Sequence, residues 1–331
     1  MKVAVLGAGA IGAYVGAALH RGGTEVHLIA RRAHLTAMRE HGVRVLSPRG
    51  DFTAHPHVTD DPAEVGEVDF VFLGLKANSY ATCGPLLAPL LGPETAIVAA
   101  QNGIPWWYFH GLAGHPLEGR RIETVDPGGS VTAVLGLRRA IGCVVYCSTV
   151  IEEPGVIRHL EGTRFSLGEP DGGISARCKV LSAAMIVGGL KAPVEPRLRD
   201  DIWIKLMGNV AFNPLSALTR ATMAQMCEHD DTRALVATMM TETLAIARAA
   251  GSDPKVSVEK RIDGAWRVGH HKTSMLQDLE AGKPLETDAI IGAVVELAAL
   301  TGVPAPALRH VHAAIGLLGH TSTTPVPVGS H

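Results

Sequence analysis

Cysteine, aromatic residues and any excess of one charge are all scarce in this sequence. Its five cysteines are an odd number without a CxxC pair, and there is no HExxH pattern, so neither a disulfide framework nor a metal site is predicted. The chain carries 30 Lys and Arg against 32 Asp and Glu, which argues against a protein that binds nucleic acid or an anionic membrane. The apolar start lacks the basic flank and cleavage pattern of a signal peptide. We therefore expect a cytoplasmic protein that acts on small molecules.

The remaining composition is typical of a soluble enzyme with two domains. The 331 residues are 47% hydrophobic and 19% charged, which is enough apolar material for more than one core. We expect an α/β domain over residues 1–196, an all-helical domain over 197–320 and a polar tail over 321–331.

Local patterns along the chain support this division. Apolar runs at 2–6, 25–29, 70–75 and 95–100 predict buried parallel strands. Residues 142–167 alternate in the manner of antiparallel strands, and the preceding stretch 102–139 is expected to be irregular. Helices are predicted after the first strand up to residue 19, and at 32–41, 176–187, 203–218, 232–250, 274–281, 289–300 and 308–318.

The first predicted strand runs into a glycine-rich turn, Gly7-Ala8-Gly9-Ala10-Ile11-Gly12. In a G-x-G-x-x-G turn, the first glycine permits the sharp bend, the second lets the backbone approach a pyrophosphate, and the third allows the helix to pack on the strand. The helix N-terminus then receives the phosphates. A glycine turn with only a structural role is the alternative, but the strand-turn-helix context favours a Rossmann-type dinucleotide site.

The end of the second predicted strand indicates which dinucleotide is bound. An NAD enzyme places Asp or Glu there for the ribose 2′-hydroxyl, whereas this chain has Arg31 and Arg32. Arginine donates bidentately to phosphate oxygens, so we predict NADP(H) as the cofactor. The alternative is that both arginines only begin a solvated helix.

Lys76 and Asn102 follow two predicted strands at the sheet edge where open α/β sheets bind ligands. This position makes both of them candidate site residues. The alternatives are a surface lysine and an Asn-Gly turn at Asn102-Gly103, because both of these residues tolerate positive φ.

A polar stripe crosses the apolar segment 203–218. Lys205, Asn209 and Asn213 recur every four residues and so share one helical face. Buried amine and amide groups need polar partners. The partner could be structural, such as an ion pair between Asp201 and Lys205, or it could be a polar substrate in a cleft.

Two further polar residues suit helix starts. Ser274 with Gln277 fits a capping box. Glu286 suits a first helical turn, where the helix dipole favours negative charge.

Taken together, these stretches resemble the ketopantoate reductase (2-dehydropantoate 2-reductase) family. The resemblance covers nearly the whole chain and is carried by the glycine turn, Leu75-Lys76-Ala77, Asn102-Gly103, the segment 203–218 and the segment 273–286. It implies NADPH-dependent reduction of ketopantoate to pantoate in pantothenate biosynthesis. It also implies a Rossmann domain followed by a helical domain like that of 6-phosphogluconate dehydrogenase, with the active site between them.

The resemblance also implies roles for individual residues. Lys205 is the expected proton donor, which supplies an ammonium to the alkoxide that forms when hydride reaches the 2-keto carbon. Its pKa should be lowered by burial and raised by Glu286, with the protonated form favoured. The implied substrate contacts are Asn102, Asn209, Asn213 and Ser274. The implied cofactor contacts are Gly7, Ala8, Gly9, Ala10, Ile11, Gly12, Arg31, Arg32, Lys76, Asn102, Cys147 and Glu286.

One departure from the family bears on the substrate. Four consecutive aromatics, Trp106-Trp107-Tyr108-Phe109, follow Asn102 in a chain that is only 4% aromatic. They could reshape or cap the substrate pocket, or they could pack in the core or in a dimer interface, so a homodimer stays open. The alternatives to a ketopantoate reductase are therefore a paralogue that reduces another 2-keto acid and a non-catalytic NADP-binding sensor.

Overall fold

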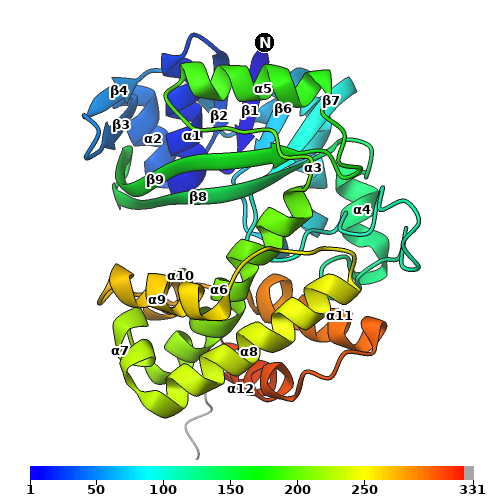
Figure 1. The fold of residues 1–331 in the computed structure, drawn as a ribbon. Helices are drawn as coiled ribbons and strands as arrows, with labels where there is room; N and C mark the ends of the chain where they lie inside the picture. The colour runs from blue at the N-terminus through cyan, green and yellow to red at the C-terminus, as the bar shows by residue number, and fades with distance from the viewer. Residues whose placement is uncertain (324–331) are drawn as a thin grey trace, which may run out of the picture.

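The computed structural model describes residues 1–323 and consists of a sheet-containing part followed by a helical part (Figure 1). The strands are β1 (Lys2–Leu6), β2 (Glu25–Ile29), β3 (Val43–Leu46), β4 (Phe52–Ala54), β5 (His57–Thr59), β6 (Val68–Leu73), β7 (Leu91–Ala99), β8 (Ala140–Glu153) and β9 (Val156–Gly168). The α-helices of this part are α1 (Ala10–Arg21), α2 (Arg32–His41), α3 (Gly84–Leu87), α4 (Ser130–Leu135) and α5 (Ala176–Val187). Its short 3₁₀ helices are η1 (Pro62–Glu64), η2 (Ala77–Thr82), η3 (Ala88–Leu90) and η4 (Pro127–Gly129).

All nine strands form one sheet in the order β4-β3-β9-β8-β7-β6-β1-β2-β5. Neighbouring strands from β5 to β8 are parallel, as the apolar runs predicted. β8 and β9 form a long antiparallel hairpin, which confirms the prediction for 142–167. The short strands β3, β4 and β5 were not predicted, and the stretch 102–139 that was expected to be irregular contains α4.

The second part of the chain is helical. Its elements are α6 (Leu198–Thr219), α7 (Met223–Glu228), α8 (Asp230–Ala249), α9 (Val258–Val268), α10 (Ser274–Glu280), the π-helical segment η5 (Asp288–Gly292), α11 (Ala293–Thr301) and α12 (Pro306–Thr323). α6 runs from the sheet into the helical part (Figure 1). The predicted pairing of a Rossmann-type domain with an all-α domain is confirmed, although α7 and α9 were missed.

α12 continues to Thr323, three residues into the predicted tail, and the remainder of that tail, 324–331, lies outside the described residues. Within residues 1–323, no helix has both the length and the apolar character that a bilayer crossing requires.

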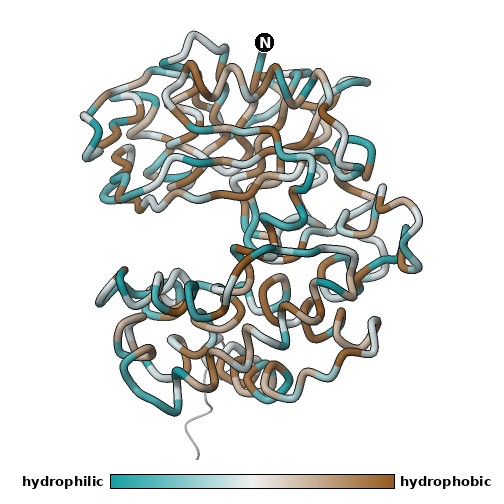
Figure 2. The backbone as a smooth tube through the Cα atoms, in the orientation of Figure 1, coloured by the Kyte–Doolittle hydropathy of each residue, from teal (hydrophilic) through white to brown (hydrophobic). Residues whose placement is uncertain are grey.

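Two hydrophobic clusters hold the molecule together. One lies on one face of the sheet beneath α1 and α5. The other is continuous from the opposite face of the sheet into the helical part, and hydrophobic residues follow the inner strands in Figure 2. Because one core spans both parts, the sheet and the helices are fixed to each other by apolar packing.

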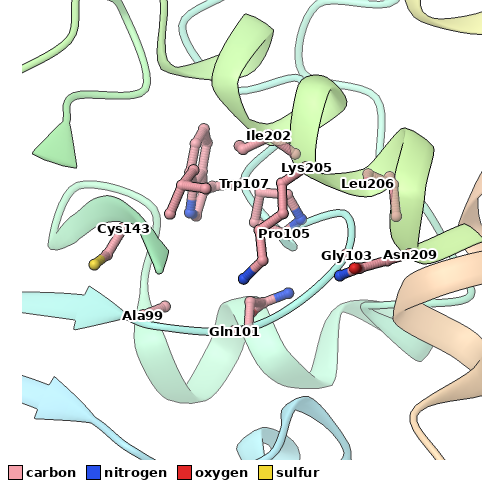
Figure 3. Close-up of a pocket in the computed structure, with 11 residues that line it drawn as sticks. Ala99, Gln101, Gly103, Pro105, Trp107, Cys143, Ile202, Lys205, Leu206 and Asn209 are labelled. Carbon is pink, nitrogen blue, oxygen red and sulfur yellow. The ribbon is translucent and has the colours of Figure 1, made fainter. Parts of the chain in front are cut away.

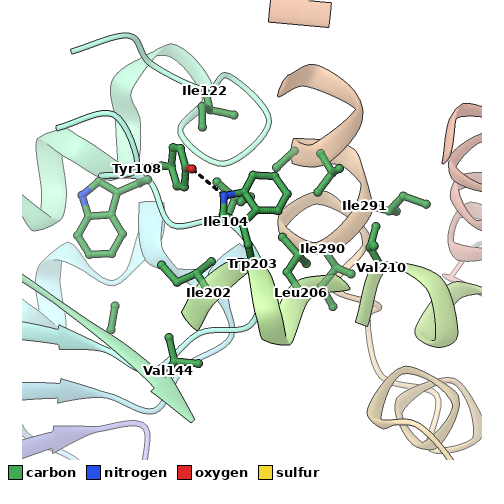
Figure 4. Packing of buried hydrophobic residues seen from close by; sticks show 14 of the residues in the cluster. Ile104, Tyr108, Ile122, Val144, Ile202, Trp203, Leu206, Val210, Ile290 and Ile291 are labelled. Atoms are coloured by element: carbon green, nitrogen blue, oxygen red, sulfur yellow. Dashed lines mark hydrogen bonds between the residues drawn. The ribbon is translucent and has the colours of Figure 1, made fainter. Parts of the chain in front are cut away.

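The aromatic run belongs to this shared core. Trp106, Trp107, Tyr108 and Phe109 are all buried. The hydroxyl of Tyr108 accepts a hydrogen bond from Nε1 of Trp203 on α6 at 2.7 Å (Figure 4) and donates to the Ala250 carbonyl oxygen at 3.2 Å. The run therefore anchors α6 to the sheet domain, as expected of core aromatics.

Candidate active site

The turn between β1 and α1 has the geometry of a dinucleotide site. Gly7 has φ of +95°, and a Cβ on Gly12 would lie 2.3 Å from the Gly7 carbonyl oxygen, so neither position accepts a side chain without strain. No side chain caps the N-terminus of α1 at Gly9, which leaves its backbone N–H groups available to phosphate oxygens.

A cleft extends from this turn to the end of β2. It is lined by Gly7, Ala8, Gly9, Arg31, Arg32, His34 and Lys76, among others. Arg31 and Arg32 are exposed, and Arg32 has φ of +56°, a left-handed conformation for a non-glycine residue. Such a conformation costs about 1 kcal/mol or more and is often found at ligand sites. The two guanidinium groups and the open helix terminus thus lie along one cleft and could hold the phosphates of a dinucleotide.

His34 is a residue of this cleft that sequence reasoning missed. Its Nδ1 accepts a hydrogen bond from the Gly155 backbone N–H at 3.0 Å, so Nε2 carries the proton in the neutral ring. Burial lowers its pKa. Within the described residues, this Nε2 is buried and has no hydrogen-bond partner. Only the position of His34 near Arg31 and Arg32 could have indicated it as a residue of the cleft.

Lys76 connects the two domains. Its Nζ donates to Asp278 Oδ2 at 2.7 Å and to the Pro284 carbonyl oxygen at 3.0 Å. Both partners belong to the helical domain and lie more than 200 residues away in sequence. Lys76 also lines the cofactor cleft, so a contact between Lys76 and the cofactor remains a prediction.

The polar face of α6 points at the loop that follows β7. Lys205 Nζ donates to Asn102 Oδ1 at 2.8 Å. Lys205 and Asn209 line a small pocket together with Gln101, Trp107 and Cys143 (Figure 3). Gln101 was not predicted, although it directly precedes Asn102 at the end of the strand. The structure thus brings Lys205, Asn209 and the Asn102 loop together.

The structural alternative for Lys205 is not formed. The Asp201 carboxylate is bound by Arg164 at 2.8 Å, and the Lys205 ammonium is bound by Asn102 instead. The lysine is thus held by a neutral amide oxygen, which leaves its charge available to a ligand.

The surroundings of Lys205 bring its pKa close to neutral pH. Burial lowers the pKa of Lys205 to about 8, although Cys143 and Glu286 act in the opposite direction. Burial also raises the pKa of Cys143 and of Cys147 to about 12. At neutral pH these thiols are therefore protonated, and Lys205 is mainly an ammonium, in line with the expectation from the sequence.

Glu286 lies at the junction of these groups. Burial raises its pKa, whereas Lys76, a backbone N–H at Ala77 and Lys205 lower it. The carboxyl group is thus within electrostatic reach of both lysines. The prediction that Glu286 lies in the first turn of a helix is wrong, because η5 begins at Asp288 with Thr287 as its N-cap, and Glu286 precedes both.

The Asn102 loop is positioned by the helical domain. The Ile104 backbone N–H donates to the Ala289 carbonyl oxygen at 2.8 Å. Gly103 has φ of +85°, and a Cβ there would lie 1.9 Å from the same oxygen. Only glycine allows this approach, and the π-helical segment supplies the carbonyl. The loop therefore holds Asn102 against Lys205 only while the two domains are packed.

The remaining predicted residues are placed as follows. Asn213 is 4% exposed, and within residues 1–323 its Nδ2 has no hydrogen-bond partner. Ser274 is exposed at the first residue of α10. Cys147 lies on β8, close enough to Lys205 to affect its pKa. Direct contacts of these three residues with a substrate or a cofactor stay predictions.

The predicted capping box at Ser274 is wrong. The N-cap of α10 is Thr273, whose hydroxyl accepts from the Leu276 N–H. The Gln277 side chain donates to the Lys272 carbonyl oxygen rather than to the cap backbone. Thr273 is one residue earlier and its hydroxyl also bonds Ser216 on α6, which ties the start of α10 to α6.

Known proteins with a similar sequence and fold were compared with this chain. A family model described as "Ketopantoate reductase PanE/ApbA" matches residues 3–107, and one described as "Ketopantoate reductase PanE/ApbA C terminal" matches residues 197–318. The 2-dehydropantoate 2-reductase of Mesorhizobium japonicum is 47% identical over 316 residues, which covers 95% of this chain and 97% of that protein.

Solved structures show the same similarity. The crystal structure of 2-dehydropantoate 2-reductase from Geobacter metallireducens GS-15 has a TM-score of 0.85 and 30% identity, and it covers 96% of this chain and 100% of that one. A ternary structure of D-mandelate dehydrogenase with NADH and anilino(oxo)acetate has a TM-score of 0.81 at 21% identity and covers 98% of this chain and 100% of that one. The latter shares the fold.

Proposed function

The chain belongs to the ketopantoate reductase family, and from this membership we propose that it reduces 2-dehydropantoate to pantoate with NADPH, as a step of pantothenate biosynthesis. The observation that carries the proposal is the Lys205 ammonium, which is held by Asn102 at 2.8 Å beside Asn209 and below the strand ends of the dinucleotide fold. A protonated lysine in that place is a suitable acid for a carbonyl reduction.

Individual residues have distinct roles in the proposed reaction. Bound NADPH supplies a hydride to the 2-keto carbon. Lys205 donates its proton to the keto oxygen as negative charge develops there, which completes the hydroxyl of the product. Asn102 orients the ammonium, and Glu286 favours its charged form. Asn209, Asn213 and Ser274 are proposed to bind the polar groups of the substrate.

Cofactor preference is proposed to reside in the two arginines after β2. Arg31 and Arg32 line the cleft that begins at Gly7 and Gly9. The double substitution of both arginines by Ala should raise the Michaelis constant for NADPH and barely change that for NADH. Equal effects on both cofactors would contradict the assignment.

The aromatic wall of the pocket favours one alternative substrate class. Trp107 lines the Lys205 pocket, so a 2-keto acid with a larger or aromatic side chain would find an apolar contact there. Steady-state assays with NADPH, on 2-dehydropantoate and on a panel of other 2-keto acids, compare the proposed substrate with this alternative class. A much higher kcat/KM for another acid would overturn the proposed substrate.

The catalytic assignment is tested separately by Lys205→Met. Loss of a general acid should lower kcat by about 10²–10⁴-fold, with folding unchanged by circular dichroism. Unchanged turnover would reject Lys205 as the donor, and a wild-type chain that binds NADPH but reduces no keto acid would favour a non-catalytic sensor.

The division of the chain is also a proposal. We infer a cofactor domain over 1–196 and a substrate domain over 197–320, since α6 begins at Leu198. The charge balance and apolar content support a cytoplasmic location, and a homodimer is compatible with the fold.

A further inference from the structure

Arg261 on α9 is a positive charge that the protein leaves without a counter-ion. Its side chain is half-buried, and its Nε atom is buried without a hydrogen-bond partner. Within residues 1–323, its guanidinium group makes no ion pair and no hydrogen bond. Burial lowers the pKa of Arg261, but an arginine side chain stays protonated in proteins. A partly desolvated charge of this kind is unfavourable unless a partner neutralises it.

Two carboxylates that could have paired with Arg261 are bound elsewhere. Asp263, two residues further along α9, is bound by Arg233 at 3.0 Å. Asp201, on the polar face of α6, is bound by Arg164 at 2.8 Å. Neither acid neutralises Arg261, so its unpaired state points to an anionic ligand.

The Arg261 guanidinium lies against the polar face of α6. A Cβ on Gly208 would be 2.8 Å from Nη2 of Arg261, so this nitrogen occupies the space that a side chain at position 208 would take. Gly208 is three residues after Lys205 and directly precedes Asn209. Residues three apart on a helix are neighbours, with Cβ atoms about 5–6 Å apart. Arg261 is therefore next to the residues that are proposed to act on the substrate.

The sheet domain approaches the same group. The Tyr146 hydroxyl on β8 is within electrostatic reach of Arg261 and donates to the Asp201 carbonyl oxygen at 3.2 Å. β8 also carries Cys143, which lines the Lys205 pocket. In Figure 1, the β8–β9 hairpin lies above α9. Arg261 thus belongs to the junction of α6 with β8, as Lys205 does.

The proposed reaction brings two kinds of anion to the protein, the phosphates of the dinucleotide and the carboxylate of the keto acid. The cleft that is expected to hold the phosphates is lined by residues of the sheet domain, among them Gly7, Arg31 and Arg32. Arg261 belongs to the helical domain and lies on the face of α6 that carries Lys205. The carboxylate is therefore the better match.

A 2-keto acid carries its carboxylate on the carbon beside the keto group, so the two groups need neighbouring partners in the protein. Lys205 is proposed to act on the keto oxygen, whereas the side chains proposed to bind the other polar groups are uncharged: Asn209, Asn213 and Ser274. An arginine fork binds a carboxylate through two parallel hydrogen bonds. We propose that Arg261 binds the substrate carboxylate and makes the site selective for 2-keto acids over uncharged ketones. This inference rests on the proposed reductase function and adds the residue that recognises the acid group.

Calorimetry measures this recognition without turnover. 2-Oxoisovalerate and its uncharged methyl ester are titrated into the protein saturated with NADP⁺. We expect Arg261→Gln to weaken binding of the acid about tenfold or more, the effect of losing hydrogen bonds to a charged group, and to leave binding of the ester unchanged. Unchanged binding of the acid would overturn the proposal. So would an equal loss for acid and ester, which indicates a structural role, or a wild type that binds no acid at millimolar concentrations.

Two further variants control for charge and for side-chain shape. Arg267→Gln removes an exposed arginine of the same helix and should bind the acid as the wild type does. Arg261→Lys keeps the charge but loses the planar fork, so its affinity for the acid should lie between those of the wild type and Arg261→Gln. A loss in Arg267→Gln as large as that in Arg261→Gln would reject a specific contact.

Steady-state kinetics separates this inference from the proposed function. If the protein reduces 2-dehydropantoate, Arg261→Gln should raise the KM for the keto acid about tenfold or more, with a smaller change in kcat and the same KM for NADPH. Turnover with an unchanged KM for the keto acid would refute the role of Arg261 and leave the reductase function standing. Acid binding that depends on Arg261 in a protein without turnover would refute the reductase function alone.

Discussion

Replacing Lys205 by methionine should make the protein more stable at neutral pH while lowering the proposed reductase activity. Lys205 is an ammonium whose surroundings disfavour its charge, because burial lowers its pKa from 10.5 to about 8. Methionine keeps the unbranched side chain and a good helix propensity in α6. Catalytic residues often cost stability in this way.

The magnitude follows from the pKa shift. A lowering of about 2.5 units, at 1.36 kcal/mol each, means that the folded state disfavours the ammonium by about 3 kcal/mol. Loss of the hydrogen bond to Asn102 Oδ1 offsets part of this gain, by about 1.5 kcal/mol or more for a charged donor. We therefore expect Lys205→Met to raise the free energy of unfolding by about 1–2 kcal/mol at pH 7.

The pH dependence gives the sign of the effect. The pKa of Lys205 is lower in the folded state than in the unfolded state, so the unfolded chain binds more protons between about pH 8 and pH 10.5. The wild-type penalty is therefore complete below pH 8 and disappears as the pH rises towards 10.5. The advantage of the variant should shrink over the same window.

Urea unfolding of the wild type and of Lys205→Met at pH 7 and at pH 9.5 measures the stability gain and its dependence on pH. The matched control is Lys179→Met, which changes an exposed lysine of α5 and should shift stability by no more than about 0.5 kcal/mol. The reasoning would be refuted if Lys205→Met lost stability at pH 7, or if its effect were the same at both pH values.

Three other substitutions test neighbouring features. Glu286→Gln removes a carboxylate that raises the pKa of Lys205, so the alkaline limb of the pH profile of kcat/KM should move to lower pH. An unchanged limb would show that Glu286 does not affect the protonation of Lys205. Gly142→Ala places a Cβ 2.4 Å from a leucine methyl and 2.5 Å from the Trp107 ring; urea unfolding should show a loss of about 1–3 kcal/mol, and a neutral result would contradict the packing. Asp278→Ala removes the ion-pair partner of Lys76, so the Michaelis constant for NADPH should fall. The decrease should be at most about fivefold, which corresponds to the free energy of a partly exposed ion pair, and an increase would show that the pair supports cofactor binding.

Local signals in the sequence predicted the parts of the fold that depend on neighbouring residues. The glycine turn and its flanking strand and helix follow from a contiguous motif, and the long apolar strands follow from composition. β3, β4 and β5 are short strands at the outer parts of the sheet without a continuous apolar run, so nothing local distinguishes them from loops. α9 begins at a Ser257 cap, and α7 begins at a capping box on Thr222. Both caps are local sequence features, so these two helices were predictable from the sequence.

The site was predictable in residue type but not in pairing. The spacing of Lys205 and Asn209 requires only a helix, so the polar face could be predicted. The pairing of Lys205 with Asn102 could not be predicted. The two residues are 103 positions apart, and nothing in the sequence around either residue indicates the contact. The same limit applies to the start of α10, where Thr273 caps the helix and its hydroxyl also bonds Ser216, a distant residue on α6.

The interdomain bonds show what assembles this site. Asn102 receives the Lys205 ammonium, Ile104 donates to the Ala289 carbonyl oxygen, and Lys76 is bound by Asp278. Each bond joins a strand-end loop of the sheet domain to the helical domain. The loop that contacts the Lys205 ammonium is thus itself held by the domain from which that lysine comes. The position of the ammonium therefore depends on the packing of the two domains. Gly103 permits this packing, because a side chain at that position would separate the loop from the π-helical segment.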